Sequence, residues 1–243
     1  MIFSRRSFIK TLGIMSTLSW TLPHLVQASQ PMRIGIIGAG SLGGTVGRIW
    51  VKAGHEVMFS SRHPGELTAM ANEIGTRAST GSPADAAKFG MVLLLAVPFV
   101  AVPQIGRELR NAYRGKIVLD ATNPWGESES EIYQEAQKYG VAQTVAKYMP
   151  DARLVRAFSS VDATVVASSG ARAEERIGMP IASDDSQAMQ LAAELVRDAN
   201  CDPVITGDLA SAAMFQPGGP GFRAHLTAKE LRRRLGLPLA NRA

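Results

Sequence analysis

Apolar and polar residues follow two different periods along this chain. Short continuous apolar runs, such as MVLLLAV at residues 91–97, are separated by longer stretches in which apolar residues recur every three or four positions. Continuous runs are typical of strands that are buried on both faces of a parallel sheet, and the longer period is that of amphipathic helices. The alternation of the two predicts an α/β fold with helices on both faces of a mainly parallel sheet.

The same pattern gives approximate positions for the elements. Strands are expected at residues 33–37, 56–60, 91–97, 116–121, 154–158, 179–182 and 203–206. Helices are expected at residues 42–53, 64–74, 103–112, 130–139 and 186–199. Another helix should begin at Thr227, because Thr227 and Glu230 have capping-box spacing and Gly236 with Pro238 forms a stop signal.

No internal repeat and no Pro/Ser-rich linker divides the chain after residue 28. We therefore expect a Rossmann-type, doubly wound sheet over residues 29–167. A smaller C-terminal α/β extension over residues 168–243 should complete the sheet and the substrate pocket. An apolar content of 46% in 243 residues is sufficient for a substantial core.

The first 28 residues form a separate segment. Arg5 and Arg6 precede an apolar run at residues 11–22, and Val26-Gln27-Ala28 ends in the small residue that signal peptidases require. The run is shorter than the ~20 residues of a membrane-spanning helix. The string SRRSFIK resembles the twin-arginine signal, which implies the twin-arginine export machinery as a partner, export in the folded state, and a periplasmic location after cleavage behind Ala28. The alternatives are a helix of the domain itself and an uncleaved membrane anchor.

Charge and cysteine content narrow the classes of function. Without Arg5, Arg6 and Lys10 the 26 basic residues fall to 23 against 21 acidic ones, so the net charge falls from +5 to +2. No aromatic residues are interleaved with a basic stretch, and we expect no nucleic-acid partner. The single cysteine, Cys201, excludes an internal disulfide and is compatible with folding before export.

A glycine-rich motif follows the first expected strand. Residues 38–43, GAGSLG, fit the pattern G-x-G-x-x-G between the strand MRIGII and the helix SLGGTVGRIWVKAG. In a dinucleotide site Gly38 permits the tight turn, Gly40 lets the backbone approach the pyrophosphate, and Gly43 lets the helix pack on the strand. Ser41 and Leu42 open the helix, whose N-terminus attracts phosphate. The context therefore indicates a dinucleotide site rather than a purely structural turn.

The second expected strand indicates which dinucleotide binds. NAD sites carry an acidic residue at its end, whereas this strand ends in Ser61, Arg62 and His63. Arg62 can bind a 2′-phosphate through two hydrogen bonds and Ser61 can donate its hydroxyl. A charge-assisted bond of about 1.5–3 kcal/mol would favour NADP by roughly 10- to 100-fold. The sequence thus predicts NADP, although Arg62 could also be an ordinary surface arginine.

The next strand ends contribute further candidates. Ala96, Val97 and Pro98 should let the cofactor pass close to the backbone, with Phe99 as a wall, because the carboxyl ends of parallel strands line the ligand crevice. Asn123 in ATNPWG can bond a carboxamide or a substrate carbonyl. A buried strand followed by a helix-starting proline explains the first stretch as well, and Asn-Pro is also a turn signal.

With these motifs in place, the chain resembles the NADPH-dependent reductases of the deazaflavin coenzyme F-420, whose domain is akin to the N-terminal domain of pyrroline-5-carboxylate reductases. The matching strings are IGIIGAGSLGGTVG, FSSRHP, VLLLAVP, VLDATNP, ARLVRAFSSV, GMPIASDD and DPVITGDLASA. The resemblance implies that the cofactor lies over residues 38–43, that Ser61 and Arg62 meet the 2′-phosphate, and that residues 96–98 with Ala157 and Phe158 lie near the nicotinamide. The family usually carries Asn-Thr where this chain has Ser159 and Ser160.

We therefore expect an exported NADP(H)-dependent oxidoreductase that transfers a hydride between nicotinamide and a small acceptor, which by resemblance is deazaflavin- or flavin-like. A non-catalytic NADP-binding module is the alternative from another class. An imine reductase of the pyrroline-5-carboxylate type would need a long helical dimerisation domain, for which residues 208–243 are too short. A second redox cofactor as the partner and a homodimer remain open.

Catalytic side chains are not evident in the sequence. The histidines are scattered without metal-ligand spacing, and no Ser-His-Asp set is visible. This is consistent with hydride transfer, in which the cofactor supplies the chemistry. His225 and Tyr148 are the candidate proton donors. Phe215, Phe222 and the glycines between them form either a lid over the substrate or a loop.

Overall fold

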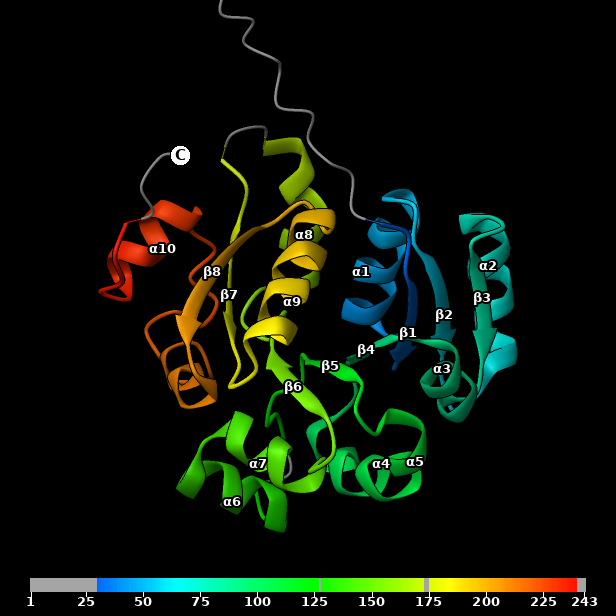
Figure 1. Ribbon diagram of the computed structural model, residues 1–243, viewed down its shortest axis with the longest axis horizontal. Helices are drawn as coiled ribbons and strands as arrows, with labels where there is room; N and C mark the ends of the chain where they lie inside the picture. The colour runs from blue at the N-terminus through cyan, green and yellow to red at the C-terminus, as the bar shows by residue number, and fades with distance from the viewer. Residues whose placement is uncertain (1–29, 127, 173–174, 240–243) are drawn as a thin grey trace, which may run out of the picture.

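The fold is organised around one eight-stranded sheet. The computed structural model describes residues 30–126, 128–172 and 175–239, so the expected export segment lies outside the described residues. The strand order is β3-β2-β1-β4-β5-β6-β7-β8 (Figure 1). All neighbouring strands are parallel except β6 and β7, which pair antiparallel at Arg156 and Ala182. The expected Rossmann-type, mainly parallel architecture is confirmed.

The elements follow the expected alternation closely. The strands are β1 (Arg33–Ile37), β2 (Glu56–Ser60), β3 (Ala78–Gly81), β4 (Val92–Leu95), β5 (Ile117–Asp120), β6 (Arg153–Arg156), β7 (Gly178–Ala182) and β8 (Asp202–Gly207). The α-helices are α1 (Ser41–Lys52), α2 (Thr68–Ile74), α3 (Pro83–Phe89), α4 (Val102–Glu108), α5 (Arg110–Tyr113), α6 (Glu131–Tyr139), α7 (Val141–Tyr148), α8 (Ala163–Ser169), α9 (Ser186–Asp198) and α10 (Ala228–Arg234). Four 3₁₀ helices complete the described elements: η1 (Pro64–Leu67), η2 (Phe99–Ala101), η3 (Gly170–Arg172) and η4 (Leu209–Met214).

The two faces of the sheet carry separate cores because successive side chains of a strand point to opposite faces. In β4, Val92 and Leu94 join the core under α1, α8 and α9, whereas Leu93 and Leu95 join the core under α3 to α7. The buried run VLLL is therefore apolar at every position. This is the three-layer arrangement that the continuous apolar runs predicted.

Trp50 connects three parts of the first core. Its indole N–H donates to the carbonyl of Leu195 at 2.8 Å, which links α1 to α9. Its ring also meets Phe158 edge-on, with centroids 5.6 Å apart, directly after β6. Buried indole N–H groups need such a partner. The contact thereby fixes the backbone that follows β6 against the helix that follows the glycine motif.

Three expectations about single elements need correction. The strand β3 has no counterpart among the expected elements, because ASTG contains no apolar run and is only half buried. The helix expected at residues 103–112 is divided into α4 and α5 at Leu109. Strand β4 is shorter than the apolar run, since residues 96 and 97 already belong to the loop that follows it.

The C-terminal part of the chain extends the same sheet. Strands β7 and β8 continue it beyond β6, and α10 packs beside them (Figure 1). Helix α10 begins with the expected capping box between Thr227 and Glu230. Cys201, immediately before β8, is fully buried, and burial raises the pKa of its thiol to about 11. Within the described ranges, no helix has the length and apolar character to cross a membrane.

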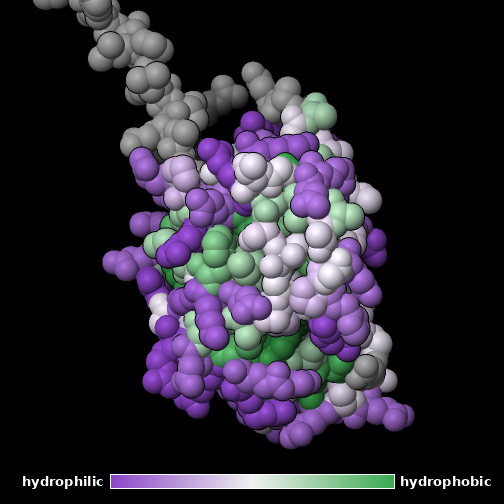
Figure 2. Space-filling view, turned by 90° about the vertical axis from the view of Figure 1, so that its right-hand side faces the viewer, coloured by the Kyte–Doolittle hydropathy of each residue, from purple (hydrophilic) through white to green (hydrophobic). Residues whose placement is uncertain are grey.

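Apolar residues gather on one side of the molecule near the level of the strand ends. Figure 2 shows the side that carries β3 and α2, where hydrophilic and apolar residues are mixed. Apolar residues gather in the lower part of this face, between hydrophilic ones. In Figure 1 that level is the one at which β1 and β2 reach their carboxyl ends. In doubly wound sheets this is the edge at which ligands bind.

Candidate cofactor and acceptor site

The sheet order brings the expected site residues into one row. Strands β2, β1, β4, β5 and β6 are neighbours, and they are parallel, so their carboxyl ends lie along one edge. Residues 61–62, 38–43, 96–98, 123 and 157–160 follow these five strands in that order. The crevice of such a fold opens where consecutive crossovers leave in opposite directions, which here is between β1 and β4.

The glycine motif has the geometry of a phosphate-binding turn. Gly38 has a φ of +98°, and a Cβ at this position would lie 2.3 Å from the carbonyl oxygen of Ala96. A Cβ on Gly43 would lie 2.2 Å from the carbonyl oxygen of Gly38, so this glycine permits close packing of helix on strand. A Cβ on Gly40 would meet nothing within 4 Å. Gly40 therefore borders open space next to the first N–H groups of α1, as the pyrophosphate would require.

The residues after β2 lie beside this turn. The N–H groups of Gly38 and Ala39 donate to the carbonyl of Ser60, at 3.3 and 2.9 Å, which ties the turn to the end of β2. The Ser61 hydroxyl accepts from the N–H of His63 at 2.9 Å and keeps its own proton for another acceptor. The Arg62 side chain is exposed and has no hydrogen-bond or ion-pair partner within the residues that the structure describes. It is thus available for a phosphate.

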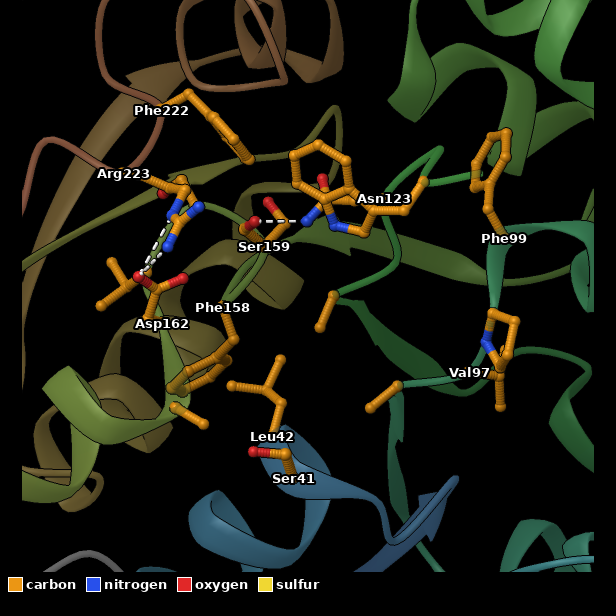
Figure 3. A pocket seen from close by; sticks show the side chains of 17 residues that line it. Ser41, Leu42, Val97, Phe99, Asn123, Phe158, Ser159, Asp162, Phe222 and Arg223 are labelled. Atoms are coloured by element: carbon orange, nitrogen blue, oxygen red, sulfur yellow. Dashed lines mark hydrogen bonds and ion pairs between the residues drawn. The ribbon is translucent and has the colours of Figure 1, made fainter. Parts of the chain in front are cut away.

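A cavity of about 460 Å³ continues from the turn along the strand ends (Figure 3). Ser41 and Leu42 reach it from α1, Val97 and Phe99 from the segment after β4, and Phe222 and Arg223 from the opposite side. The residues that line it are Ser41, Leu42, Ala96, Val97, Pro98, Phe99, Ala121, Asn123, Trp125, Phe158, Ser159, Ser160, Val161, Asp162, Ala163, Phe222 and Arg223. The walls are mainly apolar with a few polar groups, as is usual for small-molecule sites.

A buried ion pair fixes the amide of Asn123 in the cavity wall. Arg156 and Asp120 are both fully buried, with a guanidinium nitrogen 2.6 Å from the carboxylate oxygen Oδ2. The other terminal nitrogen of Arg156 donates to Oδ1 of Asn123 at 2.8 Å. The amide nitrogen of Asn123 then donates to the carbonyl of Ser159 at 2.6 Å. One amide hydrogen of Asn123 is left over, and the network determines where it points.

Several features of the wall are unfavourable without a ligand. The hydroxyls of Ser159 and Ser160 and Nε of Arg156 are buried and lack a hydrogen-bond partner among the described residues. Phe158 and Arg223 line the cavity with φ values of +59° and +50°, which are uncommon for residues other than glycine. Unpaired polar groups and backbone strain of this kind cost free energy and tend to accumulate at functional sites.

The far end of the cavity carries an ion pair and two aromatic rings. Arg223 donates to Oδ2 of Asp162 through Nη2 at 2.6 Å and through Nε at 3.1 Å (Figure 3). His225, with a φ of +49°, lies 3.4 Å from the same oxygen but does not line the cavity. The rings of Trp125 and Phe222 meet with centroids 5.5 Å apart. The sequence did not single out Trp125, Asp162 or Arg223, because they reach the site only through the fold.

The expected site residues divide into three groups. Six of them line the cavity: Ser41, Leu42, Ala96, Val97, Pro98 and Asn123. Another five surround the turn beside it: Gly38, Gly40, Gly43, Ser61 and Arg62. Ala157 is fully buried in the core, and the residues after it reach the cavity in its place. The left-handed conformation of Phe158 explains this shift, since it turns the chain out of the strand direction.

Two further expectations are corrected by the arrangement. Tyr148 lies on α7 and does not line the cavity. Phe215 is fully buried in the core under α3 to α7, so it is not part of a lid, whereas Phe222 does reach the cavity. The segment between them is held by hydrogen bonds, among them Gly221 N–H to the Met214 carbonyl at 2.8 Å. It is therefore a fixed turn in this structure.

The residues present fit NADP. The open space at Gly40, the unpaired guanidinium of Arg62 and the adjoining cavity provide for a pyrophosphate, a 2′-phosphate and a ring system in the expected order. Comparison with known proteins agrees. Residues 33–124 match the protein family described as NADP oxidoreductase coenzyme F420-dependent. Over these residues, the chain has the sequence of an NADP-dependent oxidoreductase. The expected enzyme class and cofactor are thereby confirmed.

The chain is also similar to individual proteins. The mouse (Mus musculus) protein Metalloreductase STEAP2 is 24% identical over 207 residues, which are 84% of this chain and 40% of the relative. A hypothetical protein from Sinorhizobium meliloti has a TM-score of 0.71 at 24% identity and covers 82% of this chain and 96% of its own. A protein from Arthrobacter sp. FB24 named for F420-dependent NADP reduction has a TM-score of 0.63 at 19% identity, covering 74% and 87%. These likenesses extend the fold match beyond residue 124.

Proposed function

We propose that this chain is an exported enzyme that transfers a hydride between NADP(H) and a small flavin- or deazaflavin-like acceptor bound in the cavity of about 460 Å³. The observation that carries the proposal is the continuity of this cavity with the glycine turn of residues 38–43. When bound, the cofactor supplies a hydride, and the acceptor takes up that hydride and one proton from water while NADPH becomes NADP⁺.

The residues of the chain bind and orient the two reactants. Gly40 and the N-terminus of α1 hold the pyrophosphate, and Ser61 with Arg62 holds the 2′-phosphate. Ala96, Val97 and Pro98 let the nicotinamide lie close to the end of β4, where Leu42 and Phe158 exclude water. Asn123, held by Arg156, offers its remaining amide hydrogen to a carbonyl of one of the rings. Because the proton comes from water, these roles require no catalytic side chain that donates one.

The nature of the hydride favours a ring over a metal ion as the direct acceptor. The name of the mouse relative, a metalloreductase, raises a metal ion, for example ferric iron, as an alternative. A hydride carries two electrons, whereas ferric iron accepts one, so iron reduction needs an intermediary that takes two electrons and releases them singly. A flavin-type ring in the same cavity would meet this requirement.

Consumption of NADPH tests the proposal. Purified protein should oxidise NADPH, measured at its absorbance band, with at least one member of a panel of deazaflavins, flavins, quinones, imines and ferric chelates. The Asn123→Ala variant, which removes the oriented amide, should slow this turnover. A complete blank across the panel with bound NADP would count against catalysis and leave the non-catalytic module. That alternative predicts a nicotinamide region blocked by protein, whereas the cavity beside residues 96–98 supports an accessible one.

The imine reductase alternative is less well supported. Its long helical dimerisation domain would have to follow β8, where the described residues contain η4 (Leu209–Met214) and the seven-residue helix α10. Turnover of a cyclic imine with no turnover of flavins or deazaflavins would nevertheless revive it.

The location of the enzyme is the second part of the proposal. The string SRRSFIK and the small residue Ala28 support export by the twin-arginine machinery and cleavage behind Ala28. Substitution of Arg5 and Arg6 by lysine should retain the protein in the cytoplasm, as measured by fractionation. Mass spectrometry of the exported protein should show Ser29 as its first residue and bound NADP. A protein that is found outside the cytoplasm despite both lysines would contradict this route.

A further inference from the structure

The cavity has a second end that the expected cofactor-binding residues do not explain. The residues at the ends of β2, β1 and β4 account for the cofactor from its 2′-phosphate to its nicotinamide. Trp125, Phe158 and Phe222 line the cavity from the segments after β5, β6 and η4. Strand β6 is three neighbours away from β1, so roughly 14 Å of sheet width separates the glycine turn from this end. The second end therefore faces the acceptor rather than the cofactor's phosphates.

Two aromatic rings from distant segments meet there. The ring centroids of Trp125 and Phe222 are 5.5 Å apart, and the ring planes are inclined by 51°. Trp125 is 61% exposed, although the cavity that it borders also has buried walls at Phe158 and Ser160. An exposed indole forgoes the hydrophobic stabilisation that a covering group would provide. The separation leaves no room for a ring between the two, so a ligand would stack against one face of the pair.

The backbone that carries Phe222 is fixed despite an unfavourable conformation. Arg223, the next residue, has a φ of +50°. Its N–H donates to the carbonyl of Ser160 at 2.8 Å, and its guanidinium donates to Asp162. The N–H of Phe222 itself donates to the carbonyl of Gly219 at 3.1 Å. These bonds hold the Phe222 ring at the cavity at the expense of local strain, which is a mark of a functional position.

We propose that Trp125 and Phe222 form the acceptor subsite and bind a planar, conjugated tricyclic ring by stacking. The proposal rests on the proposed function and adds the residues that select the acceptor. Aromatic stacking tolerates changes at the ring edge because every such ring presents a π-face. The subsite therefore selects planar ring acceptors as a class, and acyclic imines and metal chelates gain nothing from it.

Binding of riboflavin, a ring acceptor without a phosphate, tests the subsite. The full chain saturated with NADP⁺ should bind riboflavin, measured by equilibrium dialysis with the fluorescence of the flavin. Trp125→Leu and Phe222→Leu should each weaken this binding by at least about fivefold. Trp125→Phe, which retains an aromatic ring, should recover most of the affinity. The dissociation constant for NADP⁺, measured by titration calorimetry, should change less than twofold in all three variants.

Tyr139 offers a matched control. It is 56% exposed and lies at the end of α6, outside the residues that line the cavity. Tyr139→Leu removes a similar exposed ring and should leave riboflavin binding unchanged. Unchanged binding in both Trp125→Leu and Phe222→Leu, an equal loss of NADP⁺ affinity, or no binding by the unsubstituted protein would each overturn the subsite. An unsubstituted protein that oxidises NADPH with an acyclic imine but binds no riboflavin would keep the hydride-transfer function and refute the subsite alone.

Discussion

At the scale of single residues, the choice of cofactor depends on an unpaired guanidinium. Arg62 is exposed beside the glycine turn and has no partner in the described part of the chain. Because no group of the protein competes for it, a 2′-phosphate has to displace only water from this guanidinium. Ser61 adds one hydroxyl proton at the same position.

Replacing this arginine should change the cofactor preference. Arg62→Ala should weaken NADP⁺ binding by about 10- to 100-fold and leave NAD⁺ binding within about twofold, as measured by calorimetric titration of both. Arg77→Ala is the control, since Arg77 is an exposed arginine just before β3. Equal losses for the two dinucleotides in Arg62→Ala would contradict the assignment of the phosphate to this residue.

The unpaired hydroxyl of Ser160 leads to the prediction that its removal stabilises the protein. Ser160 is 1% exposed and its hydroxyl has no hydrogen-bond partner among the described residues, so the folded protein bears the cost of removing it from water. Ser160→Ala should raise the free energy of unfolding by up to about 1 kcal/mol in urea denaturation. Ser183→Ala should lower it by about 1 kcal/mol, because that hydroxyl donates to the carbonyl of Leu154 at 2.7 Å. Destabilisation by Ser160→Ala would show that the hydroxyl is paired in solution.

At the scale of elements, two glycines between β1 and α1 should affect different properties. One should affect the stability of the fold and the other the binding of NADP⁺. A Cβ on Gly43 would collide with the backbone of Gly38, whereas a Cβ on Gly40 would enter open space and Gly40 has an ordinary φ of −74°. Gly43→Ala should therefore lower the free energy of unfolding by about 1–3 kcal/mol. Gly40→Ala should leave stability nearly unchanged and weaken NADP⁺ binding by about tenfold, or ~1.4 kcal/mol, or more.

Thermal unfolding and cofactor titration of both variants measure the two effects. For Gly40→Ala, the thermal unfolding measurement serves as the control for the titration. Unchanged stability shows that a loss of NADP⁺ binding is not caused by misfolding. Normal NADP⁺ affinity in a folded Gly40→Ala protein would place the pyrophosphate elsewhere.

The start of α9 predicts how stability depends on pH. Asp185 accepts from the guanidinium of Arg153 at 2.6 Å and caps α9 at the N–H of Ala188. The hydrogen bond from Arg153 lowers the pKa of this carboxyl to about 2. A carboxyl with a lowered pKa in the folded state contributes stability above its ordinary pKa of about 3.9. This contribution is lost as the pH falls from about 4 towards 2.

Urea denaturation at a series of pH values would measure this contribution. Asp185→Asn should be less stable than the unsubstituted protein at pH 7 and should lose less stability between pH 4 and pH 2. Parallel pH profiles for the two proteins would show that the ion pair adds nothing in solution.

Most elements could be predicted because their apolar patterns are strong. The strands β1 and β2 have the expected bounds, since both are buried runs between turn residues. The edge strand β3 could not be predicted, because its small residues ASTG acquire strand conformation only by pairing with β2. Helix α8 was not among the predicted helices. Its short stretch of Ala, Ser and Val has little helix propensity of its own, and its packing against α1 stabilises the helical conformation.

The candidate site was predictable only where its residues follow strands. Gly38, Arg62, Val97 and Asn123 were found because the carboxyl ends of parallel strands are recognisable positions. Trp125 and Arg223 come from loops and were not predicted, because loop contacts depend on the complete fold, and Phe222 was expected only as part of a lid or a loop. The prediction placed the wall at Ala157, one residue before the first residue of this segment that lines the cavity. The left-handed conformation of Phe158, which causes this difference, cannot be predicted from the sequence.

At the scale of the whole molecule, one continuous sheet serves both reactants. The cofactor is expected over β2, β1 and β4 and the acceptor over β5 and β6, while β7 and β8 extend the sheet beyond them. The contact of Trp50 with Phe158 and Leu195 connects the two halves through the core. A finished fold that encloses its cofactor suits an export route that carries folded proteins, as proposed from the N-terminal segment.

Because Cys201 is buried, the rate at which its thiol is alkylated should report how often the molecule unfolds transiently. With a pKa near 11 and no exposed surface, on the order of one thiol in ten thousand is ionised at pH 7, and none of it is accessible to reagent. Alkylation followed by mass spectrometry should therefore proceed only through molecules that have transiently unfolded. Saturating NADP⁺ should slow the labelling by the factor by which it stabilises the native state, one plus the ratio of ligand concentration to dissociation constant. The labelling rate of Cys201 would thus give the affinity for NADP⁺ even while the acceptor is unidentified.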